Sequence, residues 1–211
     1  MNAAAATFLV IAGICAFADW YAVARPSKTL EYVAKPATLA ALIVVALLLD
    51  PVDDAQRAWF VVALVFSLGG DVFLMLPRDL FVAGLASFLV GHLAYVVGIN
   101  LTGGDALDVL VAAVVVVAVA APLALKIVRS VVAVDTKLVG PVVVYILAIT
   151  AMVVSAVAAG IAWMILGAVL FYASDALIAW NRFVRPAAWM PVAIIVTYHL
   201  GQAGLTLGLL G

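Results

Sequence analysis

Residues 66–95 read FSLGGDVFLMLPRDLFVAGLASFLVGHLAY, and this stretch decides the fold. Two apolar runs are joined by a short turn at residues 77–79, and each run carries one ionisable residue, Asp71 in the first and His92 in the second. A run of about 20 mainly apolar residues is long enough to cross a bilayer as a helix. An ionisable side chain in hydrocarbon is costly unless it has a partner or a water-filled cavity. We therefore expect two membrane-spanning helices here, with a functional site near Asp71.

The composition of the whole chain agrees with a membrane protein. Of its 211 residues, 69% are hydrophobic and 10% are charged, and the mean hydropathy is +1.35. These values lie far outside the range of soluble globular domains. The net charge of −1 and the lack of a basic stretch exclude a nucleic acid as partner.

Apolar segments of spanning length recur along the chain and predict an all-α, polytopic membrane protein with eight transmembrane helices in a single domain, residues 1–211. The predicted spans are 3–24, 33–49, 58–76, 80–101, 106–125, 138–159, 162–180 and 187–210. We expect the first to be a retained helix rather than a cleaved signal peptide, because no positive charge precedes it. Pro36 would lie in the first turn of the second span, where a missing N–H costs little.

The loops differ sharply in basic residues, and this predicts the orientation. With eight spans, nine of the ten Lys and Arg residues fall on one side and Arg57 alone falls on the other. The nine are Arg25, Lys28, Lys35, Arg78, Lys126, Arg129, Lys137, Arg182 and Arg185. Positive charge stays on the cytoplasmic side, so both termini of this cell-membrane protein are predicted on the outer face.

The two halves of the chain share a spacing. Asp71 and Asp175 lie 104 positions apart, as do Arg78 and Arg182. Because four spans separate the halves, a repeat would be parallel rather than inverted. Two parallel four-helix repeats and coincidence in an apolar background both remain open interpretations.

Several buried polar residues are predicted to share one depth. Asp71 and Asp175 each lie seven residues before an arginine of a basic loop, and Asp19 lies six before Arg25. At 1.5 Å of helical rise per residue, all three carboxyl groups lie on the order of 10 Å inside the cytoplasmic boundary. Deeper polar residues follow at His92, Tyr198, His199 and Gln202. If their helices face one another, these residues form a cleft that opens toward the cytoplasmic side.

Each of these residues also has a purely structural interpretation. Asp71 and Asp175 could pair with a histidine, a tyrosine or a helix end, and His92 could be an interhelical hydrogen bonder. Asp19 stands beside Trp20 in what could be an interfacial aromatic belt. Lys35 is a candidate for binding a lipid phosphate.

Sequence motifs of common cofactor and metal sites are absent. The chain has no glycine-rich phosphate loop, H-E-x-x-H, G-x-S-x-G or Cys/His cluster with zinc spacing. We therefore predict neither a cofactor nor a metal.

The motifs taken together resemble those of the YhhN-type lysoplasmalogenase family, over nearly the whole chain. The matching residues are Lys35-Pro36, Ser67-Leu68-Gly69-Gly70-Asp71, Gly84, Phe88, His92 and Tyr95, then residues 170–175, Arg182-Phe183, and Tyr198 with Gln202. Asp19 and His199 are not parts of the pattern, so the resemblance assigns them no role.

The resemblance implies an eight-helix enzyme that hydrolyses the vinyl ether bond of lysoplasmalogens to a fatty aldehyde and glycerophosphoethanolamine or glycerophosphocholine. Such hydrolysis needs an acid that protonates carbon and a carboxylate that stabilises an oxocarbenium ion. Two carboxyl groups in a low-dielectric layer can divide these roles, as in glycosidases, because burial and mutual repulsion favour a proton on one of them.

The expected site follows from that chemistry, with a lysophospholipid substrate drawn from the membrane. Asp71 and Asp175 are the expected catalytic residues, with the assignment of acid and base open. The expected substrate-binding residues are Lys35, Ser67, His92, Ser174, Tyr198 and Gln202.

Two functions of other classes compete with this prediction. A small transporter or lipid flippase would also carry buried carboxylates, but it should have polar residues that reach both faces. A structural or partner-binding membrane protein would tolerate asparagine at both aspartates, and it leaves their shared depth unexplained.

Overall fold

The computed structural model of the chain describes residues 1–51, 53–102 and 104–211, and these parts are helical throughout, with short connections. The helices are α1 Ala3–Ala24, α2 Lys28–Leu48, α3 Asp54–Met75, α4 Phe81–Asn100, α5 Ala106–Val134, α6 Val139–Ala159, α7 Ala162–Phe183 and α8 Met190–Leu207. Two 3-10 turns, η1 Thr136–Leu138 and η2 Gly208–Leu210, precede α6 and follow α8. Within the described ranges, all eight helices are long and apolar enough to cross a membrane. The prediction of an all-α polytopic membrane protein is confirmed.

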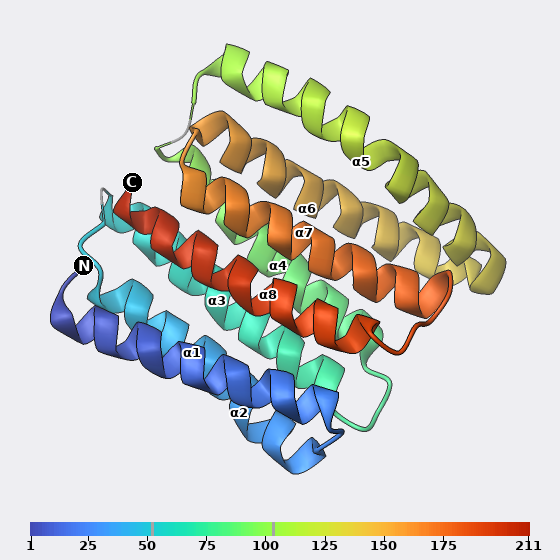
Figure 1. The fold of residues 1–211 in the computed structure, drawn as a ribbon. Helices are drawn as coiled ribbons and strands as arrows, with labels where there is room; N and C mark the ends of the chain where they lie inside the picture. Colours follow the sequence, from blue (N-terminus) through green and yellow to red (C-terminus); the bar gives the residue numbers. More distant parts are fainter. Residues whose placement is uncertain (52, 103) are drawn as a thin grey trace.

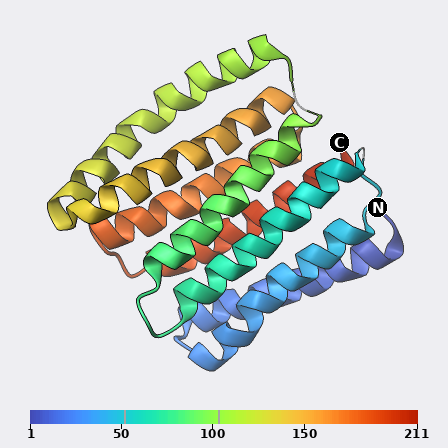
Figure 2. The same ribbon diagram turned by 180° about the vertical axis from the view of Figure 1, so that it is seen from behind.

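Helices that follow one another in the chain pack side by side as α1–α2, α3–α4, α5–α6 and α7–α8. Figures 1 and 2 show α3 and α4 on one face of the bundle, α7 and α8 on the other, and α5 at an edge. Both termini lie at the same end of the bundle (Figure 1), as an even number of spans requires. The two-repeat interpretation stays a prediction.

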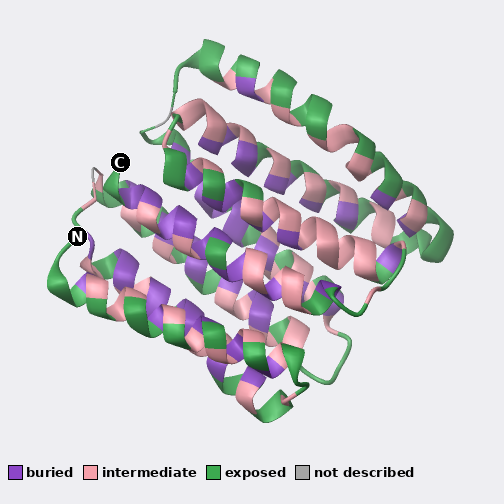
Figure 3. Ribbon diagram, in the orientation of Figure 1, coloured by how far each residue is buried: buried purple, intermediate pink, exposed green. Residues whose placement is uncertain are grey.

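Small residues let the central helices approach closely. A methyl group on Gly204 of α8 would lie 2.9 Å from the Cα atom of Gly167 of α7, and one on Gly201 would lie 2.8 Å from the backbone nitrogen of Phe171. In a membrane such contacts replace the hydrophobic effect as the force that joins helices. The buried residues accordingly gather on inward faces, whereas α5 is largely exposed (Figure 3).

Four helices, α2, α3, α5 and α7, are longer than predicted, and α2 and α5 differ the most. The helix α2 begins at Lys28, so Pro36 lies inside it rather than in its first turn, and Glu31 pairs with Lys28 and Lys35 across the added turns. The helix α5 continues to Val134, so Lys126 and Arg129 lie on an exposed helix face rather than in a loop. Charged residues end a hydropathy window, but they are good helix formers, so the helix continues past them.

The turn between α3 and α4 is tied to the end of α7. Arg182 donates a hydrogen bond to Asp79 at 2.9 Å, and its guanidinium carbon lies 4.1 Å from the centre of the Phe81 ring. This hydrogen bond and the positive charge hold the pKa of Asp79 below its usual value. Arg182 therefore joins the end of α7 to the turn between α3 and α4.

Candidate active site

Asp71 lies one turn before the end of α3 and is 5% exposed. Its Oδ2 atom accepts a hydrogen bond of 2.7 Å from the hydroxyl group of Tyr198 on α8. The neighbouring residue, Gly70, has no side chain, and the ring of Phe88 from α4 occupies the space there. This contact joins α3 to α8 through two residues that are 127 positions apart in the sequence.

Asp175 has a different set of partners. The hydroxyl group of Tyr145 on α6 donates a hydrogen bond to its Oδ2 atom. His92 Nε2 lies 3.6 Å from the same oxygen, while His92 Nδ1 lies 2.6 Å from the backbone oxygen of Phe88. A carbonyl oxygen only accepts, so Nδ1 carries a hydrogen, and Nε2 faces Asp175 from beyond direct hydrogen-bond distance. Tyr145, Asp175 and His92 form a compact acid-base group.

The two carboxyl groups do not share a hydrogen bond among the described contacts, but they lie close enough for Coulomb interaction. Aromatic rings connect them. The Tyr198 ring lies 5.3 Å from that of Phe171, and the Phe171 ring lies 4.7 Å from that of His92. Each aspartate therefore has its own tyrosine donor, and the rings hold the two groups in one rigid arrangement.

A further buried pair, Tyr95 and Gln202, extends the network along α8. Tyr95 donates a hydrogen bond of 2.6 Å to Gln202 Oε1, and Gln202 stands one turn after Tyr198. Both residues of this pair are fully buried. The amide nitrogen of Gln202 has no partner within the described part of the chain, so it can donate to a bound molecule.

The two predicted serines differ in their surroundings. Ser67 is buried one turn before Asp71, and its hydroxyl group has no hydrogen-bond partner in the described structure. Ser174 instead donates to the backbone oxygen of Ile194 at 3.0 Å and so ties α7 to α8. The structure brings Ser67 toward the site but turns the Ser174 hydroxyl group to a neighbouring helix.

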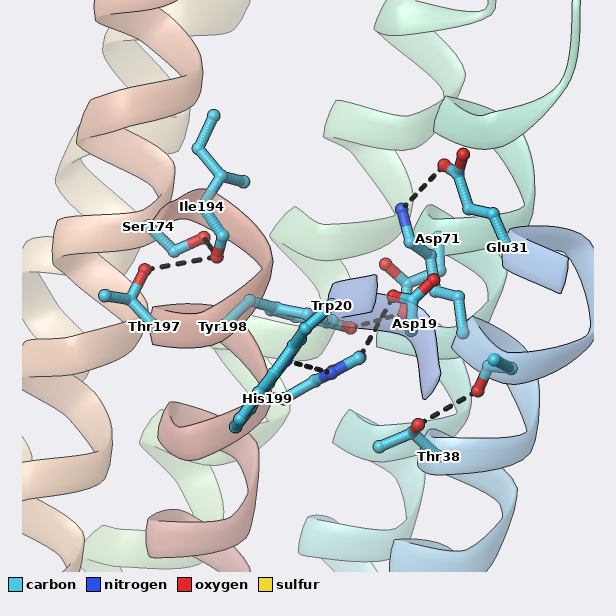
Figure 4. Close-up of polar contacts among 12 residues, drawn as sticks. Asp19, Trp20, Glu31, Thr38, Asp71, Ser174, Ile194, Thr197, Tyr198 and His199 are labelled. Carbon is cyan, nitrogen blue, oxygen red and sulfur yellow. Dashed lines mark hydrogen bonds and ion pairs between the residues drawn. The ribbon is translucent and has the colours of Figure 1, made fainter. Parts of the chain in front are cut away.

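Lys35 lies on α2 close to Asp71, with a side chain that is 14% exposed. Its ammonium nitrogen is 3.5 Å from Glu31 Oε1, and Lys28 is 2.8 Å from the other oxygen of that carboxylate. The charge of Lys35 acts on both Asp71 and Asp19. Figure 4 shows Asp19 and Asp71 next to each other below Glu31.

Two apolar cavities border this polar network. The α4/α7 cavity has walls from α3 to α7 and includes Asp175 and Tyr145. The α1/α8 cavity is bordered by Trp20, Thr38 and His199 and extends along α1 to Leu9. Both cavities are partly open and have mainly apolar walls, which suits contact with a hydrocarbon chain.

No group of three or more His, Cys, Asp or Glu side chains gathers as a metal site among the residues whose placement is described. The described site offers carboxyl, phenol, imidazole and ammonium groups.

Comparison with known proteins places this arrangement in a family. The family model described as YhhN family matches residues 30–209. The chain belongs to the YhhN family.

Curated relatives agree with that membership. The chain is 34% identical over 178 residues to proteins named lysoplasmalogenase from Mycobacterium bovis and Mycobacterium tuberculosis, which is 82% of this chain and 67% of each relative. It is 33% identical over 150 residues to human Lysoplasmalogenase TMEM86B, which is 70% of this chain and 62% of the relative. No solved structure matches the chain. The predicted family is confirmed.

The YhhN match begins inside α2 and ends at η2, so it contains every predicted site residue. Asp19 and Trp20 on α1 lie outside it. Two functional candidates inside it, Tyr95 and Tyr145, were not predicted as site residues. Each stands in a strongly apolar run, where a lone tyrosine is a signal for a buried hydroxyl group that needs a partner.

Proposed function

We propose that this YhhN protein hydrolyses the vinyl ether bond of lysoplasmalogens, with Asp71 and Asp175 as the acid-base pair. The observation that carries the proposal is the pair of inward-facing aspartates, each held by its own tyrosine, with the charge of Asp71 acting on Asp175. The names of the curated relatives support the substrate class.

The reaction consumes one water and balances without a cofactor. A protonated carboxyl group gives its proton to the vinyl carbon that does not bear oxygen, and an oxocarbenium ion forms. The second carboxylate stabilises this cation and takes a proton from the water that attacks it. The resulting hemiacetal then breaks its bond to the glycerol oxygen. The second carboxyl group gives its proton to that oxygen and the first carboxylate takes the proton of the hemiacetal hydroxyl group, which releases a fatty aldehyde and a glycerophosphodiester and restores both groups. Buried, preoriented groups are effective here because charge develops where water is excluded.

The remaining site residues bind and orient the substrate. Lys35 holds the phosphate group at the end of the site near the basic loops, and Gln202 and Ser67 offer polar groups that are free to bind. His92 orients either Asp175 or the water molecule that attacks the oxocarbenium ion. The alkenyl chain lies in the α1/α8 cavity, which leads from this level toward the other end of the bundle.

The test is aldehyde release by purified Asp71→Asn and Asp175→Asn variants. Asparagine keeps the shape of aspartate but neither gives nor takes a proton, so each variant should lose at least about 100-fold in turnover. Asp50→Asn, at an exposed position after α2, is the matched control, and a saturated ether analogue should release no aldehyde. Folded variants that keep near-full turnover would disprove this mechanism.

A further inference from the structure

The α1–α8 cluster, which consists of Asp19, Trp20 and His199, is a buried polar group that the proposed chemistry leaves unused. Asp19 is fully buried and His199 is 2% exposed. Neither oxygen of Asp19 has a hydrogen-bond partner in the described parts of the chain, nor does His199 Nε2. Burying such groups without partners is costly, so the cluster is arranged for a bound group.

The hydrogen-bonding pattern defines what that group must offer. Trp20 Nε1 only donates, and it donates to His199 Nδ1 at 3.2 Å. Nδ1 is therefore the acceptor of the ring, and Nε2 carries the hydrogen. Nε2 lies 3.9 Å from Asp19 Oδ2, too far for a direct hydrogen bond. A group that accepts from Nε2 and donates to the carboxylate satisfies both, and an alcohol hydroxyl does both.

The surroundings indicate which hydroxyl this is. Asp19 lies beside Asp71, and Tyr198, which precedes His199, donates to Asp71 (Figure 4). The charge of Lys35 acts on Asp19, His199 and Asp71. The α1/α8 cavity begins at Trp20 and His199. Four features therefore adjoin one another: a lysine for the phosphate, a site for a hydroxyl group, a catalytic carboxyl group and a cavity for a chain. A glycerophospholipid with one chain has the matching groups.

We infer that Asp19 and His199 bind the free glycerol hydroxyl group of the lysophospholipid and select for single-chain substrates, an inference that rests on the proposed function. An acyl group on that oxygen would remove the hydrogen that Asp19 accepts. The carboxylate would then stay buried without a partner, and the added chain would have to fit between α1 and α8. Sites built to bind a substrate hydroxyl discriminate strongly against analogues that lack it.

The inference is tested by equilibrium binding, without turnover. The purified full-length protein in detergent is titrated with a saturated 1-O-alkyl lysophosphoethanolamine and with its analogue in which hydrogen replaces the glycerol hydroxyl group. The wild type should bind the hydroxyl ligand about 10- to 100-fold more tightly, as expected for a hydrogen bond to a charged group. Asp19→Leu and His199→Phe should lose most of this preference, because each should weaken the binding of the hydroxyl ligand and leave the binding of its analogue unchanged.

The outcomes separate this inference from the proposed function. Asp50→Asn serves as the control and should keep the wild-type preference. The inference would be overturned if the wild type bound both ligands with equal affinity. It would also be overturned if each variant weakened the binding of both ligands equally. Because the probe cannot be cleaved, absence of aldehyde release in a separate assay with the vinyl ether would count against the catalytic proposal alone.

Discussion

At the level of single residues, the tyrosine donors decide how each aspartate can act. A hydrogen bond from a phenol stabilises and orients a carboxylate by occupying one of its oxygens. In the acid, the proton that moves in catalysis is therefore held on the other oxygen, and in the base that oxygen receives the proton from water. Asp71 and Asp175 both have this arrangement, but only Asp175 also faces a histidine ring among the described contacts. The two carboxyl groups are thus chemically different, which suits one acid and one base.

Removing either tyrosine hydroxyl group should affect activity more than stability. Tyr198→Phe and Tyr145→Phe each leave an aspartate without its donor, and turnover should fall about 10- to 100-fold. Interhelical hydrogen bonds in membranes contribute on average about 0.6 kcal/mol, so unfolding should change little. Aldehyde release and thermal unfolding in detergent measure the two effects. Tyr21→Phe on the exposed face of α1 is the control, and full activity of both site variants would contradict the assignment.

Gly70 offers a test of the packing that separates the two aspartates. A methyl group there would lie 2.5 Å from the Phe88 ring, so Gly70→Ala must push this ring away from α3. The Phe88 ring packs against the rings of Phe171 and Tyr198, and Tyr198 donates to Asp71. Because catalysis is sensitive to small displacements, turnover should fall at least about tenfold.

Gly140→Ala is the matched control for this substitution, since a methyl group there meets no atom within 4 Å in the described structure. It should keep wild-type turnover. If Gly70→Ala kept full activity as well, the Phe88 position would not matter for the reaction.

At the level of helices, the substrate chain distinguishes the two cavities. Ala16 is buried on α1 and lines the α1/α8 cavity, so Ala16→Leu should fill part of it and shift the preference toward shorter alkenyl chains. Each excluded methylene removes about 0.8 kcal/mol of burial, roughly a fourfold change in kcat/KM. Rates on substrates of graded chain length measure the shift.

Ala179→Leu fills the α4/α7 cavity in the same way and is the matched comparison. It should leave the chain-length preference unchanged. A shift that appears with Ala179→Leu and not with Ala16→Leu would place the chain beside Asp175 instead.

Helix boundaries and tyrosine partners mark the limit of what the sequence predicts. The eight spans follow from hydropathy, because each crosses the same apolar thickness. The first turns of α2 and the end of α5 were missed, because their lysines and arginines interrupt the apolar pattern without interrupting the helix. Depth placed Tyr198 below the layer of the aspartates, whereas its hydroxyl group reaches up to Asp71. The bond from Tyr145 to Asp175 depends on the rotation of α6, which its mainly apolar surface does not reveal.

At the level of the whole molecule, the distribution of charge predicts that both termini lie outside and that the Lys35 end of the site lies inside. Thiol labelling of intact cells tests this in a Cys15→Ala background. Asp50→Cys, after α2, should react with a membrane-impermeant reagent, whereas Ala188→Cys, before α8, should react only after permeabilisation. Both positions are exposed, and neither substitution changes the Lys and Arg balance that sets orientation. The reverse labelling pattern would turn the site toward the outer leaflet, and the lipids of that leaflet would then be its source of substrate.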